Sequence, residues 1–216
     1  MTTSTKNQLK GSNDNKSLVK NWIMDKYEIG GDLTISDDLV VDCNGDVEVI
    51  DYSTESLTNG LFKWGTIDGN FHCFGCPKLQ NLEGAPKKVG GGFYCSQCDS
   101  LVNLKGGPEY VGKDFCCSEC KNLTSLEGAP DFVGLDFDCS DCIKLESLKG
   151  SPKQVSANFD CHGCIKLESL KGATYWVCGY FYYGGHDKIK ITNADRKNYL
   201  LKRVEYNMSL GRFEVY

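Results

Sequence analysis

A 22-residue repeat constrains the fold of this chain more than any other feature of its sequence. A Cys-x-x-Cys pair recurs at constant phase, and its first cysteines are Cys73, Cys95, Cys117, Cys139 and Cys161. The second cysteines are Cys76, Cys98, Cys120, Cys142 and Cys164. A phenylalanine stands two residues before each pair, and two leucines, a glycine and a valine follow at fixed distances. A period of this length is typical of proteins that stack one small structural unit on the next.

Each unit follows the pattern F-x-C-x-x-C-x-x-L-x-x-L-x-G-x-P-x-x-V, with the proline present in most units. The pair Phe-x-Cys predicts a short strand that turns both side chains to one face. The glycine and proline that follow exclude a long helix and predict a return segment of turns or a short 3-10 helix. Because so small a unit cannot bury its own apolar side chains, we predict a solenoid of parallel strands around a shared core.

The repeat resembles the cysteine type of leucine-rich repeat, L-x-L-x-x-C-x-x-L, with Phe and the first Cys in the two leucine positions. Segments such as FYCSQCDSLVNLKGGPEYVG and FCCSECKNLTSLEGAPDFVG resemble repeat proteins common in bacteriophage and bacterial genomes. The stretch VKNWIMDKYEIGGDLTISDDLVVDCNGDVEVID resembles the leader that precedes such repeats. The resemblance covers about residues 18–190 and implies a leucine-rich-repeat-like solenoid. It implies no particular partner, because this scaffold serves many.

The pattern divides the chain into four regions. We expect a disordered N-terminus over 1–17, an N-terminal cap over 18–48, the solenoid over 49–190 and a mixed C-terminal cap over 191–216. Val49 stands 22 residues before Phe71, so we expect the segment that begins there to be a degenerate first repeat. Irregular units at both ends would cover the open edges of the core.

Each cap has a predicted structure. In the N-terminal cap we expect an amphipathic helix over 15–27, with Val19, Trp22, Ile23 and Tyr27 facing inward. A hairpin over 39–49, centred on the Asn-Gly dipeptide at 44–45, should follow.

In the C-terminal cap, Thr192 and Asp195 have the spacing of a capping box. They predict a final helix that contains Tyr199, Leu200 and Val204.

Charge and composition limit the compartment and the partners. The formal net charge of -5 argues against a nucleic-acid binder, which usually carries a basic surface. No apolar run approaches the roughly 18 residues of a membrane span. The polar residues 1–17 lack the apolar core of a secretory signal peptide. We therefore expect a cytoplasmic protein, in the host cytoplasm if a phage encodes it, that binds neither nucleic acid nor membrane.

The thirteen cysteines pose the main chemical question. Their odd number and the missing export signal favour reduced thiols in a cytosolic protein. The pairs have the spacing of a zinc ribbon, but five evenly phased pairs leave one pair without a partner. The repeat also explains both positions without metal, the first as a core residue and the second as a weak donor to the turn backbone. We predict a buried, reduced ladder with no cofactor, and zinc is the alternative.

No catalytic set emerges from the sequence, so we do not expect an enzyme. The histidines His72, His162 and His186 lie in no recognisable nucleophile or metal motif. Cys116 points away from the Phe-x-Cys core face, and we interpret it as an incidental surface cysteine.

The outward positions around Phe-x-Cys carry the functional prediction. They are acidic in the middle repeats and aromatic toward both ends, which suits contact with a protein that has a basic surface. The predicted contact residues are Phe74, Tyr94, Asp114, Glu119, Asp136, Asp138, Asp141, Asp160, His162, Tyr180 and Tyr182. We expect a non-catalytic interaction module, and the resemblance implies a phage accessory protein that binds or inhibits a host or defence protein. The alternatives are a self-associating structural or virion protein and a zinc-binding or redox regulator.

Overall fold

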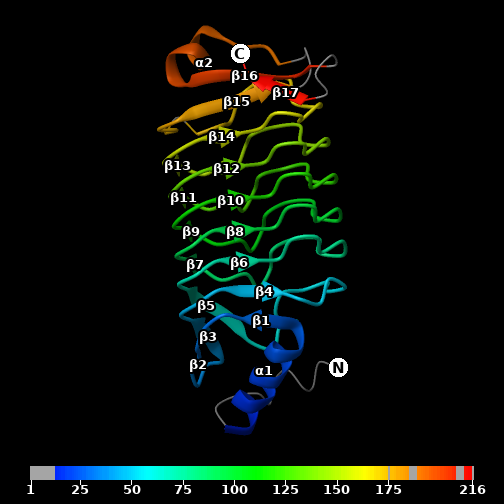
Figure 1. The fold of residues 1–216 in the computed structure, drawn as a ribbon, viewed down its shortest axis with the longest axis vertical. Coiled ribbons are helices and arrows are strands. Elements are labelled where there is room, and N and C mark those ends of the chain that lie inside the picture. Colours follow the sequence, from blue (N-terminus) through cyan, green and yellow to red (C-terminus); the bar gives the residue numbers. More distant parts are fainter. Residues whose placement is uncertain (1–12, 175, 185–188, 208–211, 216) are drawn as a thin grey trace.

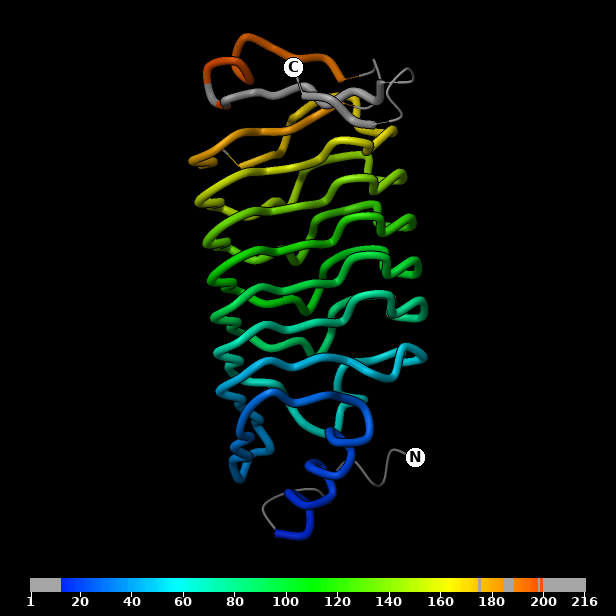
Figure 2. The backbone as a smooth tube through the Cα atoms, in the orientation of Figure 1, coloured from blue at the N-terminus to red at the C-terminus, as the bar shows by residue number. Residues whose placement is uncertain are grey.

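Each 22-residue unit forms one coil, and the coils stack into a β-solenoid of about six turns. The computed structural model describes residues 13–174, 176–184, 189–207 and 212–215. Figures 1 and 2 show the coils lying one above the next, with α1 (Asn13–Lys26) at one end and α2 (Asn193–Asn198) at the other. The prediction of a repeat solenoid is confirmed at this level.

The Phe-x-Cys segments form the first of two sheets, which we call sheet A. Its ten strands are, in spatial order, β1 (Tyr27–Ile29), β4 (Val47–Val49), β6 (Phe71–His72), β8 (Phe93–Tyr94), β10 (Phe115–Cys116), β12 (Phe137–Asp138), β14 (Phe159–Asp160), β15 (Tyr180–Gly184), β16 (Leu200–Asn207) and β17 (Arg212–Val215). From β4 to β16 all neighbours are parallel, and phenylalanine pairs with phenylalanine in successive coils. The sequence repeat therefore sets the register.

The return segments form a second sheet, sheet B, that the sequence analysis did not predict. Its strands are β2 (Leu33–Ile35), β3 (Val40–Cys43), β5 (Lys63–Ile67), β7 (Lys88–Val89), β9 (Tyr110–Val111), β11 (Phe132–Val133) and β13 (Gln154–Val155). The repeat valines pair in parallel here. Of the two predicted forms of return, turns or a short 3-10 helix, the described return segments have the turns, joined to the short strands of this second sheet. A strand with one inward residue has no period-two pattern for a sequence analysis to detect.

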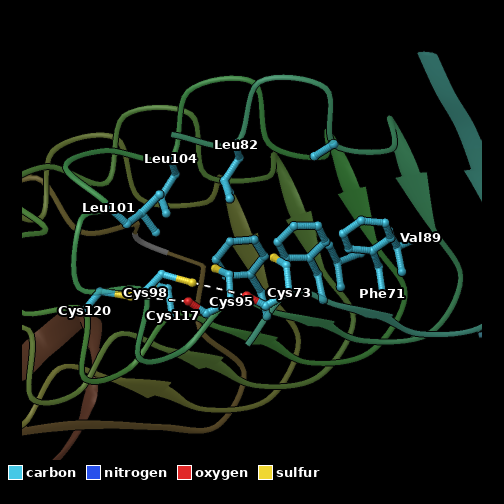
Figure 3. Packing of buried hydrophobic residues seen from close by; sticks show 14 of the residues in the cluster. Phe71, Cys73, Leu82, Val89, Cys95, Cys98, Leu101, Leu104, Cys117 and Cys120 are labelled. Atoms are coloured by element: carbon cyan, nitrogen blue, oxygen red, sulfur yellow. Dashed lines mark hydrogen bonds between the residues drawn. The ribbon is translucent and has the colours of Figure 1, made fainter. Parts of the chain in front are cut away.

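Columns of identical side chains fill the core between the two sheets. The repeat phenylalanines, from Phe71 to Phe181, are fully buried, and neighbouring rings lie 4.6–5.4 Å apart between centroids. Figure 3 shows these rings beside the cysteine column, with Val89 of sheet B close to Phe71. Burying a side chain of this size contributes roughly 2–3 kcal/mol, so one ring per coil is a large share of the stability of each repeat.

The repeat glycine after the second leucine is required by backbone geometry. Gly128 has a φ of +95°, and a Cβ there would lie 2.3 Å from the carbonyl oxygen of Leu104 in the preceding coil. The equivalent glycines all have positive φ values. Both the left-handed backbone and the close contact between coils exclude a larger residue.

The N-terminal cap agrees with the prediction in its helix but not in its strands. Val19 and Ile23 of α1 and Tyr27 of β1 are buried, as expected. Residues 13–17 belong to α1, so disorder over 1–17 is wrong for them, and residues 1–12 lie outside the described residues.

The predicted hairpin over 39–49 is wrong, because β3 joins sheet B and β4 joins sheet A. Asn44 and Gly45 form the corner between the sheets, and the parallel stacking already begins within the region assigned to the cap.

The degenerate first repeat is real but shifted by two residues. Val47, not Val49, pairs with Phe71, while Ile67 pairs with Val89 as expected. A shift of two keeps the same side chains on the same face of a strand, and both Val47 and Val49 are buried.

The C-terminal cap contains the predicted capping box but a shorter helix. Thr192 accepts from the backbone N–H of Asp195, and the Asp195 carboxylate accepts from the N–H of Thr192. The helix ends at Asn198, and Leu200 and Val204 lie in β16, which pairs in parallel with β15. This segment forms a strand and not a longer helix, because the edge of β15 would otherwise be left unpaired. No helix of the described residues is long and apolar enough to cross a membrane.

Candidate functional site

Coil stacking brings the predicted contact residues onto the outer side of sheet A. In register, one row runs from Tyr94 through Cys116, Asp138 and Asp160 to Tyr182. A second row, two residues earlier in each coil, contains Asp114, Asp136, Asn158 and Tyr180, and the turn that follows each strand contributes Phe74, Glu119, Asp141 and His162. We call this surface the acidic face. The register thus brings the predicted contact residues together, and their role in binding stays a prediction.

The carboxylates of the second row also hold neighbouring coils together. Asp114 Oδ1 accepts from the backbone N–H of Asp136 at 3.1 Å, and Asp136 Oδ1 accepts from that of Asn158 at 2.8 Å. Asn158 Oδ1 continues the series by accepting from the N–H of Tyr180 at 2.9 Å. Asp114 and Asp136 thus have a structural role that the sequence analysis missed. It could have been inferred from the recurrence of Asp or Asn at this position of successive repeats.

Tyr94 occupies the place where this series is interrupted. Gly92 has no side chain to continue it, and a Cβ at Gly92 would lie 2.5 Å from the Tyr94 hydroxyl oxygen. The Tyr94 ring stacks on His72, with centroids 4.8 Å apart, and its hydroxyl lies 3.5 Å from Asp114 Oδ2. Burial, together with the charge of Asp114, raises the pKa of Tyr94. Tyr94 is therefore a fixed, neutral aromatic side chain at the edge of the acidic face.

Cys116 is not an incidental surface residue. It is half-buried, its thiol donates to Asp138 Oδ2 at 3.3 Å, and Ser96 Oγ donates to its sulfur at 3.0 Å. Burial and the charge of Asp138 raise the pKa of this thiol. A nucleophilic cysteine needs a lowered pKa, so this arrangement suits a structural hydrogen bond rather than covalent chemistry.

His162 lies between two carboxylates of the acidic face. Its Nδ1 is 2.8 Å from Asp160 Oδ1, and its Nε2 is 3.7 Å from Asp141 Oδ2. Burial lowers the pKa of His162, but the hydrogen bond to Asp160 and the charges of Asp160 and Asp141 outweigh burial and raise it overall. Burial raises the pKa of Asp141, and His162 offsets part of that rise. Protonation of His162 would therefore reduce the negative charge of this end of the face.

The most accessible residues of the acidic face lie at its turns and ends. Phe74 is 48% exposed and Tyr180 is 44% exposed. Glu119 is exposed in the turn of the central coil, where its φ is +57°. These three side chains can contact a partner without breaking a hydrogen bond described above.

The paired cysteines lie in the core. Four of the second cysteines donate their thiol to the carbonyl of the first cysteine in the preceding coil, as Cys98 does to Cys73 at 3.2 Å and Cys120 to Cys95 at 3.3 Å (Figure 3). Cys76, in the first of these coils, lies 3.9 Å from the Phe74 carbonyl of its own turn instead. Both columns are fully buried and unoxidised. The described part of the chain contains no group of three or more His, Cys, Asp or Glu side chains placed to hold a metal ion. The predicted backbone-donor role of the second cysteine is confirmed.

Sheet B carries a surface feature that the sequence analysis missed. The residues that precede the repeat valines point outward and form a row, which we call the aromatic stripe: Lys88, Tyr110, Phe132, Gln154 and Trp176. The Tyr110 and Phe132 rings are stacked 5.0 Å apart, and Trp176 is 62% exposed. The residues of the stripe stand at one fixed position of the sequence repeat, just before the valine. That they point outward follows only from the second sheet, which the sequence analysis did not predict.

Fold and surface together define a repeat protein of the β-solenoid class, with a hydrogen-bonded acidic face on one sheet and an aromatic stripe on the other. Comparisons with protein-family models, curated proteins and solved structures found no match.

Proposed function

We propose that this chain is a non-catalytic protein-interaction module that binds a basic protein surface through the acidic face. The observation that carries the proposal is the register of sheet A, which gathers the carboxylates of successive coils into one surface with aromatic side chains at both ends. The resemblance to leucine-rich-repeat-like proteins of phages supports an accessory protein that engages a host or defence protein.

The distribution of exposed groups supports this assignment. Large exposed aromatic side chains supply much of the affinity of protein interfaces, and Phe74 and Tyr180 provide one near each end of the face. Carboxylates between them attract a basic partner and set its orientation more than they add affinity. Several of these carboxylates are already held by backbone or side-chain hydrogen bonds, so they need little ordering when a partner binds.

The test replaces two exposed side chains of the face. The variant Glu119→Lys combined with Tyr180→Ala should lose the partner that the natural chain captures from bacterial lysate under reducing conditions. Glu127→Lys is the matched control, because it makes the same charge change at an exposed residue on the return side.

Asp136→Lys is avoided because it would remove the acceptor of the Asn158 N–H. Circular dichroism should show the same fold for all chains. Equal capture by the face variant and the control would contradict the proposal.

A further inference from the structure

The aromatic stripe has a symmetry of its own. Phe132 lies at its centre, with Tyr110 and Gln154 one coil away on either side and Lys88 and Trp176 two coils away. The row continues beyond Lys88 to Thr66, and the stripe is the part of it with a cation at one end and an exposed tryptophan at the other. Lys88 already lies over the ring of Tyr110, with Nζ 5.5 Å from its centroid, so its ammonium points along the stripe.

A row with this order is complementary to a second copy of itself that runs in the opposite direction. A two-fold axis along the strand direction at Phe132 would place Phe132 on its own copy, Tyr110 on Gln154, and Lys88 on Trp176. An ammonium over an indole ring is a favourable pair, and tryptophan is the best of the aromatic acceptors. An exposed aromatic row on a sheet is also the kind of surface that marks a protein contact.

The charged row beside the stripe selects the same orientation. It contains Lys87, Glu109, Asp131 and Lys153, which are exposed and precede the first four stripe positions. In the antiparallel arrangement Glu109 faces Lys153 of the second copy on both sides of the axis. Asp131 would meet its own copy there, but Lys153 of the same chain lies 2.7 Å from it and offsets its charge. A parallel arrangement, with the two-fold axis along the stack, would instead place Lys88 on Lys88 and Trp176 on Trp176, without the ammonium–indole pairs.

We propose that sheet B is the interface of an antiparallel homodimer centred on Phe132. Such an interface is isologous and closed, so association stops at two copies. Sheets A and B lie on opposite sides of the core, so the dimer leaves both acidic faces outward. The inference does not depend on the proposed function, although a dimer would give that function two equivalent sites and hence avidity for a multivalent partner.

Charge-reversal variants test the antiparallel arrangement of the dimer. The molecular mass of each variant is measured by light scattering and sedimentation over a range of protein concentrations. The natural chain should dimerise. Glu109→Lys should weaken dimerisation roughly tenfold, because two symmetry-related pairs become like-charged, and Lys153→Glu should do the same. An equimolar mixture of the two variants should form heterodimers with near-natural affinity, because each interface pair again joins Lys to Glu. Glu127→Lys makes the same charge change in the exposed turn before Gly128, outside both rows of sheet B, so it is the matched control and should dimerise normally.

Two results would overturn the proposal. One is a natural chain that stays monomeric at every concentration. The other is that the natural chain dimerises but a mixture of the two charge variants forms no heterodimer. That result would exclude the antiparallel contact. Because mass is measured without any partner, failure here leaves the acidic-face proposal standing. Conversely, a dimer that forms normally while the acidic-face variant still captures its partner would disprove only that proposal.

Discussion

Replacing one second cysteine by alanine tests whether the cysteine ladder is a structural element of the core. The Cys120 side chain is fully buried, and its thiol donates to the Cys95 carbonyl at 3.3 Å. Cys98 and Cys142 make the equivalent bond at 3.2 Å. Burial raises the pKa of Cys120, which keeps the thiol protonated and able to donate. A zinc ligand, in contrast, must be a thiolate.

The expected loss for Cys120→Ala has two parts. Removing the buried sulfur resembles the removal of one methylene and costs about 1 kcal/mol. The Cys95 carbonyl then loses this donor inside the core, which costs about 1 kcal/mol, the low end of the usual range because S–H is a weak donor. We therefore expect a loss of about 2 kcal/mol in the free energy of unfolding. Cys120→Val keeps the apolar volume and should lose only about 1 kcal/mol.

The assay is unfolding in urea, monitored by circular dichroism. It is done in the presence of reductant, with and without a chelator. Cys98→Ala and Cys142→Ala should lose as much stability as Cys120→Ala, because each removes the same contact in its own coil. The chelator should change none of the midpoints. The reasoning fails if Cys120→Ala leaves the midpoint unchanged. It fails equally if chelation destabilises the natural chain, which would favour the zinc-dependent alternative.

Three further predictions concern the turns and the histidine. Gly128→Ala should lose about 2–4 kcal/mol in urea unfolding, because the new Cβ combines a left-handed backbone with a clash against the preceding coil. Glu119→Gly should gain about 0.5–1 kcal/mol in the same assay, because its φ of +57° suits glycine and the position is exposed. The raised pKa of His162 stabilises the fold fully below the unfolded value of 6.5, and this contribution disappears as the pH rises through the folded pKa. The stability difference between the natural chain and His162→Gln should therefore shrink as the pH rises above about 6.5, and a constant difference would contradict this prediction.

Much of the fold could be predicted because residues at equivalent positions of successive repeats are neighbours in space. When coils are parallel and nearly identical, each phenylalanine, cysteine and leucine meets its counterpart in the next coil, so the 22-residue period alone gives the register. The amphipathic pattern of α1 and the capping box of α2 were also readable, because both depend on residues within a few positions of each other.

Local patterns failed where long-range pairing decides the structure. The Asn44-Gly45 dipeptide favours a hairpin, yet its flanking strands pair with different sheets, because each gains more from stacking on the next coil. The segment at Leu200 was expected to be helical, but the open edge of β15 pairs with it.

The candidate site shows the same division. The sequence by itself determined that acidic and aromatic residues share the outer side of sheet A, because side chains alternate along a strand. Only the tertiary structure decided that Asp114 and Asp136 bind the backbone of the following coil. It alone showed that His162 lies between two carboxylates, and that Tyr110, Phe132 and Trp176 line a second exposed surface. The physical reason is that these contacts, apart from the one between His162 and Asp160, join residues about one coil apart, whose distances are set by stacking and not by the local chain.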